Sequence, residues 1–157
     1  MKIRVLFVCL GNICRSPMAE AVFRHMVRKE GLEPYFDIDS AGLGGWHTGE
    51  GPHRGTRKIL DRLGISYEGI FARQITAEDL NTFDYILGMD DGNMEGLRNL
   101  AGGTSGHVAR LLDFVEDARE KEIPDPYYTG DFETTYRLVS KGCRALLETI
   151  KREKLLI

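Results

Sequence analysis

The chain has 157 residues, a length that suits one domain with its own hydrophobic core. Apolar residues make up 42% and charged residues 29%, as in an ordinary globular protein, and no apolar run reaches the ~20 residues of a membrane span. The net charge of -3 argues against a nucleic-acid or membrane-surface partner, because neither attracts a mildly acidic surface. Three cysteines, an odd number, indicate free thiols and a reducing, cytoplasmic location.

The first half of the chain alternates between strand and helix patterns. A continuous apolar run at Lys2–Val8 predicts a strand that is buried on both faces of a parallel sheet. A helix stripe follows between Pro17 and Gly31, and we interpret Glu20 as an acid in the first turn of that helix. The next predicted elements are a strand at Tyr35–Gly42, a glycine-rich loop at Gly42–Pro52 and a helix at Gly55–Leu63.

The second half continues the alternation. Its predicted elements are a short helix at Asp79–Asn81, a strand at Phe83–Met89, a helix at Met94–Leu100, a strand at His107–Val115, a loop at Pro124–Gly130 and a closing helix in Phe132–Lys154. This order predicts an α/β fold: a small, about four-stranded, parallel doubly wound sheet flanked by helices. No repeat, low-complexity segment or linker interrupts the pattern, so residues 1–157 are predicted to form one domain.

The segment VCLGNICRSPMAEAV joins the first strand to the first helix. Ligands of parallel sheets bind at such junctions, where a helix N-terminus offers free N–H groups and partial positive charge to an anion. Gly11 permits a tight curl, and Arg15 carries donors that match two phosphate oxygens. The same groups stabilise a thiolate, so Cys9 is predicted to be a nucleophile in an oxyanion cradle. The alternative is that Cys9 is a small buried hydrophobe and Arg15 a solvated charge.

VCLGNICRSPMAEAVF resembles the phosphate-binding signature of the low-molecular-weight protein tyrosine phosphatases. The resemblance continues through DSAGLGGWHTGEGP, ARQIT, FDYILGMD and IPDPYYTGDFETTY in the family's order, and so covers nearly the whole chain. It implies a phosphate-binding loop after the first strand and two-step hydrolysis of phosphotyrosine or small aryl phosphates without metal or cofactor. The implied partners are a phosphotyrosine-containing protein and a phosphate or sulfate ion in the active site.

The resemblance assigns catalytic roles to three residues. Cys9 matches the nucleophile that forms a phosphocysteine, and Arg15 would hold the equatorial phosphate oxygens together with the loop amides. Asp125, between two prolines, matches the general acid and base, although Asp-Pro alone is a common turn signal. The residues matched to phosphate binding and loop support are Leu10, Gly11, Asn12, Ile13, Cys14, Ser16 and Ser40.

Three of these polar residues have implied supporting roles. Asn12 would brace the loop from a left-handed backbone position, Ser16 would donate to the cysteine sulfur, and Ser40 would join the support network. Many family members also carry a histidine three residues before the arginine of ARQIT, whereas this chain has Ile70 there. Another group must therefore support Asn12 and Ser40.

Aromatic residues are predicted to wall the substrate pocket. Tyr127 and Tyr128 follow the Asp-Pro motif, and Trp46 lies on the glycine-rich loop. Such walls make a deep slot that suits a phosphotyrosyl ring and is too deep for phosphoserine. The alternative is that these side chains simply pack.

The resemblance also assigns a redox role. Cys14 matches the partner of a reversible disulfide with Cys9, which would protect the nucleophile from over-oxidation; the alternative is a passive small residue. Cys143 falls in the apolar stripe of the last helix and is expected to be a core thiol. Asp90 matches a family aspartate near the loop and is expected to be structural.

Four alternative functions fit the sequence less well. A metallohydrolase is disfavoured because the histidines show no ligand spacing. A protein-arginine phosphatase is the nearest rival, although those enzymes usually carry threonine at the position of Ile13 and lack the tyrosine pair. A thiol-dependent arsenate reductase would need downstream cysteines, of which only Cys143 is present. The intact catalytic residues argue against an inactive phosphate-binding module.

Overall fold

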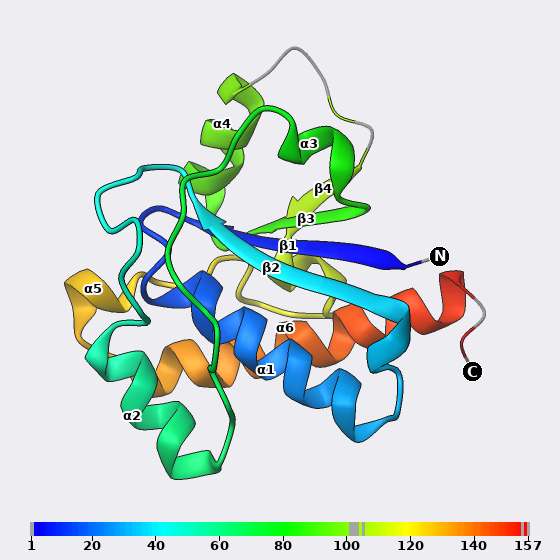
Figure 1. Ribbon diagram of the computed structural model, residues 1–157, viewed down its shortest axis with the longest axis horizontal. Helices are drawn as coiled ribbons and strands as arrows, with labels where there is room; N and C mark the ends of the chain where they lie inside the picture. Colours follow the sequence, from blue (N-terminus) through cyan, green and yellow to red (C-terminus); the bar gives the residue numbers. More distant parts are fainter. Residues whose placement is uncertain (1, 101–103, 105, 155, 157) are drawn as a thin grey trace.

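The computed structural model describes residues 2–100, 104, 106–154 and 156. Its centre is a four-stranded parallel sheet in the order β2-β1-β3-β4 (Figure 1). The strands are β1 (Ile3–Cys9), β2 (Phe36–Gly42), β3 (Tyr85–Gly88) and β4 (His107–Arg110). Because β1 pairs with both β2 and β3, it lies inside the sheet and its carboxyl end, Cys9, stands between two neighbours. The predicted fold class is confirmed.

Helices cover both faces of the sheet (Figure 1). α1 (Arg15–Lys29) and α6 (Phe132–Glu153) pack together on one face, and α3 (Asp79–Thr82) and α4 (Asp91–Leu100) lie on the other. The remaining elements are α2 (Arg54–Leu63), α5 (Pro126–Thr129) and the 3-10 turns η1 (Glu33–Tyr35) and η2 (Leu111–Phe114). Within the described ranges, no helix is both long and apolar enough to cross a membrane.

The apolar run of β1 serves two cores. Val5 and Phe7 belong to the larger core, beneath α1 and α6, whereas Leu6 and Val8 belong to the smaller core on the α4 face. Side chains of a strand alternate between faces, so a strand covered on both sides must be apolar at every position. Burial of each such side chain contributes about 1.5–3 kcal/mol. These contacts anchor the strand that ends at Cys9.

The structure corrects two predicted elements. The predicted strand at His107–Val115 is wrong beyond Arg110, where the chain turns into η2 because Asp113 Oδ2 accepts from Arg110 N at 3.1 Å. The predicted loop at Pro124–Gly130 contains the short helix α5. Asp125 caps α5, its Oδ1 accepting from Tyr127 N at 3.1 Å, and the following proline has the φ that a first helical turn needs.

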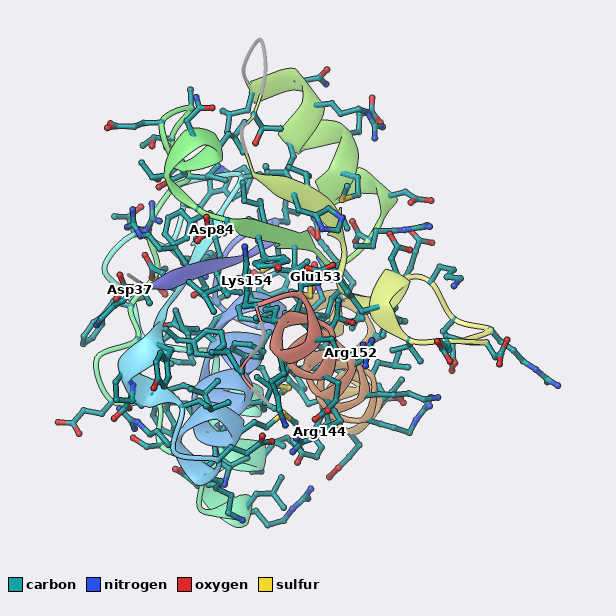
Figure 2. The ribbon with its side chains drawn as sticks, turned by 90° about the vertical axis from the view of Figure 1, so that its right-hand side faces the viewer. Asp37, Asp84, Arg144, Arg152, Glu153 and Lys154 are labelled. Carbon is teal, nitrogen blue, oxygen red and sulfur yellow. The ribbon has the colours of Figure 1, made fainter. Side chains whose placement is uncertain are left out.

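Charged side chains gather at the amino edge of the sheet, where α6 also ends (Figure 2). Asp84 Oδ2 accepts from Arg4 N at 2.8 Å, and Glu153 Oε1 accepts from the Tyr85 hydroxyl at 2.6 Å. Asp37, labelled in the same view, pairs with Lys2. These contacts belong to the end of the sheet opposite Cys9, so they tie strands and helix together without entering the candidate site.

Candidate active site

The loop between β1 and α1 forms the floor of the candidate site. Cys9 ends β1, residues 10–14 curl round, and α1 begins at Arg15 with no side-chain cap on its N-terminus. The first N–H groups of α1 have no carbonyl one turn before them in the helix, so they remain able to bind an anion. Asn12 has the left-handed φ of 58° that was predicted for it. This backbone position lets the loop turn within a few residues.

The loop lies directly against the end of β2. A Cβ atom built on Gly42 would stand 3.0 Å from the Asn12 Cβ and 2.9 Å from the Gly44 carbonyl oxygen, so glycine is required there. Gly42 N also donates to Arg73 O, and Ile75 N to Gly42 O, each at 2.8 Å. The chain around ARQIT therefore continues the sheet edge and closes over the loop.

A chain of buried hydrogen bonds runs under the loop from the cysteine. Ser16 Oγ lies 3.0 Å from Cys9 Sγ and accepts from Asn12 Nδ2 at 2.8 Å. Asn12 Nδ2 donates to Ser40 Oγ at 3.0 Å, and Asn12 Oδ1 accepts from Arg73 N at 2.9 Å. Three contacts thus hold one asparagine side chain, which explains how the residue keeps its left-handed backbone.

Arg15 is buried to 1% exposure beside the loop. Its Nη1 donates to Asp90 Oδ2 at 2.6 Å and to the Ile123 carbonyl oxygen at 2.9 Å. Burial lowers the pKa of Arg15, but the charge of Cys9 and the hydrogen bond to Asp90 raise it by more, so the guanidinium stays charged. Its Nε has no hydrogen-bond partner in the described part of the chain. A buried donor left unpaired suits an anionic ligand.

Asp125, the residue that caps α5, contacts the same guanidinium. Its Oδ2 accepts from Arg15 Nη2 at 3.3 Å, while Oδ1 is held by the amide of Tyr127. The carboxyl group is therefore fixed by the first turn of a helix that a proline begins. It is also partly open to solvent and lines the pocket, as a group that exchanges protons with a ligand and with water must be.

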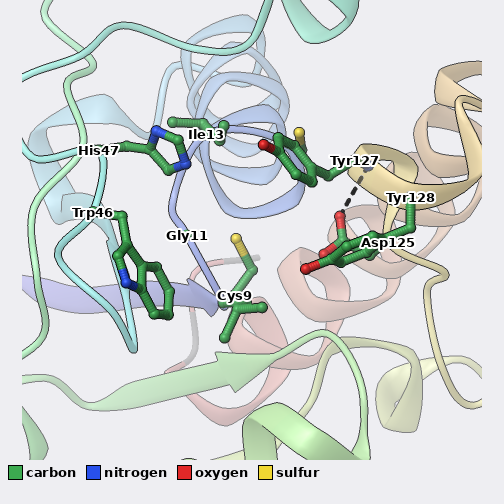
Figure 3. Close-up of a pocket in the computed structure, with 10 residues that line it drawn as sticks. Cys9, Gly11, Ile13, Trp46, His47, Asp125, Tyr127 and Tyr128 are labelled. Carbon is green, nitrogen blue, oxygen red and sulfur yellow. Dashed lines mark hydrogen bonds between the residues drawn. The ribbon is translucent and has the colours of Figure 1, made fainter.

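A pocket of about 360 Å³ opens above the loop. Figure 3 shows Cys9 between Trp46 on one side and Asp125, Tyr127 and Tyr128 on the other. The complete lining is Cys9, Leu10, Gly11, Ile13, Cys14, Trp46, His47, Asp125, Tyr127 and Tyr128. The pocket thus combines a sulfur floor with aromatic walls.

A family model described as low molecular weight phosphotyrosine protein phosphatase matches residues 4–156 of this chain. The chain belongs to that family. The Bacillus subtilis low molecular weight protein-tyrosine-phosphatase YfkJ is 56% identical over 153 residues, 97% of this chain and 98% of the relative. Its crystal structure superimposes with a TM-score of 0.96 at 55% identity, covering 98% of each chain.

Two further proteins are similar to this chain over most of its length. The PtpA phosphatase of Staphylococcus epidermidis is 40% identical over 151 residues, 96% of both chains. A Drosophila arginine phosphatase, DARP, is 34% identical with a TM-score of 0.86, covering 96% of this chain and 98% of the other. The protein is a protein-tyrosine phosphatase, a hydrolase, as the resemblance predicted.

The phosphatase brings the predicted site residues together in two layers. The predicted residues of the upper layer line the pocket and include both cysteines of the loop. The lower layer is buried beneath them and consists of Asn12, Arg15, Ser16 and Ser40. Cys143 stands apart, fully buried in the core, with its Sγ 3.7 Å from the Ala19 carbonyl oxygen.

Cys14 has an environment of its own. It is buried, and this burial, followed by the negative charges of Cys9 and Asp125, raises its pKa to about 12. The group is therefore a neutral thiol at ordinary pH and a weak nucleophile. Among the described residues, no three His, Cys, Asp or Glu side chains are grouped to hold a metal ion.

Sequence reasoning missed Glu20 as part of this phosphatase site. Glu20 is not a first-turn acid: it is the sixth residue of α1, it is buried, and its Oε1 accepts from Ser40 Oγ at 2.6 Å. Ile70, where the histidine was expected, lies in the larger hydrophobic core. A signal was present, because residues four apart share a helix face and Glu20 follows Ser16 by four.

Two other residues were missed or undervalued. His47 lines the pocket, and its Nδ1 lies 3.1 Å from Glu50 Oε2; nothing in its spacing from the other histidines indicated this. Asp90, expected to be structural, holds the buried arginine at 2.6 Å and so determines which edge of the guanidinium is left for a ligand.

Proposed function

We propose that this phosphatase hydrolyses phosphotyrosine in two steps through a phosphocysteine. In the first step the Cys9 thiolate attacks phosphorus, a sulfur–phosphorus bond forms, and the bond from phosphorus to the tyrosyl oxygen breaks. Asp125 gives its proton to the departing phenolate. In the second step Asp125 takes a proton from water, the water oxygen bonds to phosphorus, and the thiolate leaves with inorganic phosphate as the other product.

The observation that carries this proposal is the convergence of three groups on one pocket. Cys9 lies at the floor, Asp125 lines the wall, and Arg15 contacts Asp125 at 3.3 Å from the buried side. In the part of the chain that the structure describes, the Nε and Nη2 edge of the guanidinium carries only that long contact. It is therefore the edge to offer to two phosphate oxygens, with the loop amides around the others. Ser16, 3.0 Å from the sulfur, is the donor that would stabilise the departing thiolate.

The pocket walls support an aryl phosphate. Trp46, Tyr127 and Tyr128 project beside the opening, and an aromatic ring between them would gain stacking contacts that a phosphoserine side chain is too short to reach. We propose these three as the substrate-binding walls, and Leu10, Gly11 and Ile13 as the lip of the phosphate cradle. The partners are then phosphotyrosine-containing proteins and, as product or mimic, a phosphate or sulfate ion.

The similarity to an arginine phosphatase keeps phosphoarginine as the competing substrate. Ile13 lines the pocket with a branched apolar side chain, which packs against an aryl ring and offers no hydrogen bond to a guanidinium. An arsenate reductase lacks support, because Cys143 is buried in the core away from the pocket. The cytoplasmic location and the single domain over residues 1–157 stay predictions.

Cys14 is proposed as the resolving thiol. Peroxide would oxidise the Cys9 thiolate to a neutral sulfenic acid, which removes one of the charges that raise the Cys14 pKa. Condensation with the Cys14 thiol would then form a disulfide and release water. Both sulfurs line one pocket, which supports this pairing. Peptide mapping by mass spectrometry after peroxide treatment detects the linked peptides, and sulfinic acid on Cys9 without any linkage would contradict the role.

Substrate profiling tests the proposed activity. We expect a peptide containing phosphotyrosine to be hydrolysed at least tenfold faster than its phosphoarginine or phosphoserine counterparts, a ratio within reach of pocket contacts worth ~1–3 kcal/mol. The three peptides share one flanking sequence, and release of inorganic phosphate is measured in the presence of EDTA. A preference for phosphoarginine would overturn the substrate assignment.

A further inference from the structure

Glu20 is a buried carboxyl group that the proposed reaction does not use. It is 6% exposed, and its hydrogen bond to the Ser40 hydroxyl, at 2.6 Å, is the shortest of those under the loop. A buried carboxylate costs several kcal/mol unless hydrogen bonds compensate for lost water. Such a group persists where it holds something in place, and its partner here is part of the loop support.

The direction of the hydrogen bonds is determined by one backbone amide. Arg73 N can only donate, so the oxygen of the Asn12 amide faces it and the NH₂ group faces the two serines. Since Ser16 accepts from Asn12, the Ser16 hydroxyl hydrogen is free to point at Cys9 Sγ. Asn12 therefore determines that Ser16 is the donor toward the sulfur.

The same reasoning applies at the other end of the network. Ser40 Oγ accepts from Asn12, so its own hydrogen goes to Glu20 Oε1. An ionised Glu20 can only accept, so Ser40 must donate to it. This donation polarises the Ser40 hydroxyl and strengthens the hydrogen bond that Ser40 accepts from Asn12. A protonated Glu20 can instead donate to Ser40, which leaves the Ser40 hydrogen without its acceptor and makes Ser40 a weaker acceptor for Asn12.

We propose that Glu20 is a positioning residue: its carboxylate orients Ser40 and so holds in place Asn12, the residue that aims the Ser16 hydroxyl at Cys9. The inference rests on the proposed two-step reaction, in which that hydroxyl stabilises the departing thiolate. Glu20 does not touch the substrate. It acts in the place of the histidine expected at Ile70, and it differs from a histidine because it supports the loop only when it has lost its proton.

Protonation of Glu20 falls in the neutral range. Burial raises its pKa to about 7, the Ser40 hydrogen bond lowers it, and the nearby charges partly cancel. Those charges are Asp39 of β2, which raises the pKa, and Arg24 of α1 and Arg73 of the ARQIT segment, which lower it. Arg73 also holds Asp39 at 3.1 Å, so two of these three charges largely neutralise one another. Loop support therefore strengthens as pH rises through neutrality.

The test compares kcat for an aryl phosphate in the wild type and in Glu20→Gln, which keeps the shape and removes the charge. The ratio of the two kcat values cancels every other ionisation of the reaction. We expect a ratio near one at pH 5.5, where Glu20 is protonated, rising to about fivefold at pH 8.5, as the loss of one oriented hydrogen bond predicts. A larger burst of phenol release in the variant at pH 8.5 would place the effect in phosphocysteine breakdown.

Two control variants make the result specific. Glu95→Gln removes an exposed carboxylate of α4 and is expected to match the wild type at both pH values. Ser40→Ala cuts the link itself: it should lower kcat at pH 8.5 about as much as Glu20→Gln, and adding Glu20→Gln to it should have no further effect. Circular dichroism confirms that each variant is folded.

The outcomes separate the inference from the proposed function. A wild-type to Glu20→Gln ratio that is the same at both pH values would mean that Glu20 only packs, and an effect that persists in Ser40→Ala would mean that it acts by another route; either overturns the inference. Turnover by Cys9→Ser would contradict the proposed reaction instead.

Discussion

The floor and the rim of the pocket are built in opposite ways. On the floor, Arg15 is 1% exposed and its polar neighbours are tied together by hydrogen bonds from β2, α1 and the ARQIT segment. On the rim, Trp46 is 70% and Tyr128 74% exposed, so most of each ring faces solvent. A buried polar network has one low-energy arrangement, whereas exposed rings reorient at little cost. The floor is thus suited to holding a transition state and the rim to accepting varied substrates.

Substitution of Cys9, on the floor, should cause the largest loss of activity. We expect Cys9→Ser to lower turnover of an aryl phosphate by at least about 10⁴-fold, because a serine hydroxyl without an adjacent base is a poor nucleophile. Binding of inorganic phosphate should persist, since Arg15 and the loop amides remain. Steady-state kinetics and calorimetric titration with phosphate measure the two effects. Equal weakening of both would contradict the role of Cys9.

Asp125 connects the floor to the rim, and its removal should cost less. Asp125→Asn keeps the α5 cap, because an asparagine side-chain oxygen also accepts from the Tyr127 amide. The variant cannot donate or take up a proton, so hydrolysis should slow by roughly 10²–10⁴-fold. A leaving group that needs no proton should reduce the loss. An unchanged rate with a phenolic leaving group would remove Asp125 from the reaction.

The buried carboxyl group of the floor should also appear in stability. The pKa of Glu20 is raised from 4.5 to about 7, so the folded state keeps a proton that the unfolded chain releases. The resulting stabilisation is complete below pH 4.5 and is lost as pH rises to about 7, on the order of 3 kcal/mol of unfolding free energy. Urea unfolding at pH 4.5 and pH 8 measures it in the wild type and in Glu20→Gln.

In that comparison Glu20→Gln should be the less sensitive of the two proteins to the rise in pH. The exposed Glu95→Gln variant serves as the control and should follow the wild type. Identical pH dependence in all three proteins would show that folding does not raise the pKa of Glu20. That result would also contradict the inference that loop support strengthens as pH rises through neutrality.

The rim should give the smallest effects. Removal of one exposed ring, as in Tyr128→Ala or Trp46→Ala, should raise KM for a phosphotyrosine peptide by about three- to tenfold, the value of a single aromatic contact of ~0.5–1.5 kcal/mol. The kcat should change less than twofold, because neither ring touches the reacting atoms. A fall in kcat comparable to that of Asp125→Asn would show that the rim positions the phosphate. The floor and the rim would then share one role.

Much of the floor was predictable because its chemistry is local. Cys9, Asn12, Arg15 and Ser16 lie within eight positions at a strand-to-helix junction, so one short pattern indicates both the turn and the anion site. The alternation of strand and helix patterns along the chain predicted the parallel sheet, because each of those patterns is also local. Elements that depend on one capping contact could not be predicted from the sequence. The turn η2 interrupts an apolar run because of Asp113. The helix α5 begins at a proline that Asp125 caps, within a segment whose composition is typical of a loop.

The sequence by itself thus determined the fold class, the loop and the place of Cys9 at its start, because each follows from neighbours along the chain. Only the tertiary structure decided which distant groups support them: Glu20 under Ser40, Asp90 on Arg15 and His47 in the pocket wall. An acid near a helix start looks the same in sequence whether it faces water or the interior. The packing of α1 against β2 buries Glu20 beside a serine, and burial converts an ordinary surface charge into a titrating support for the site.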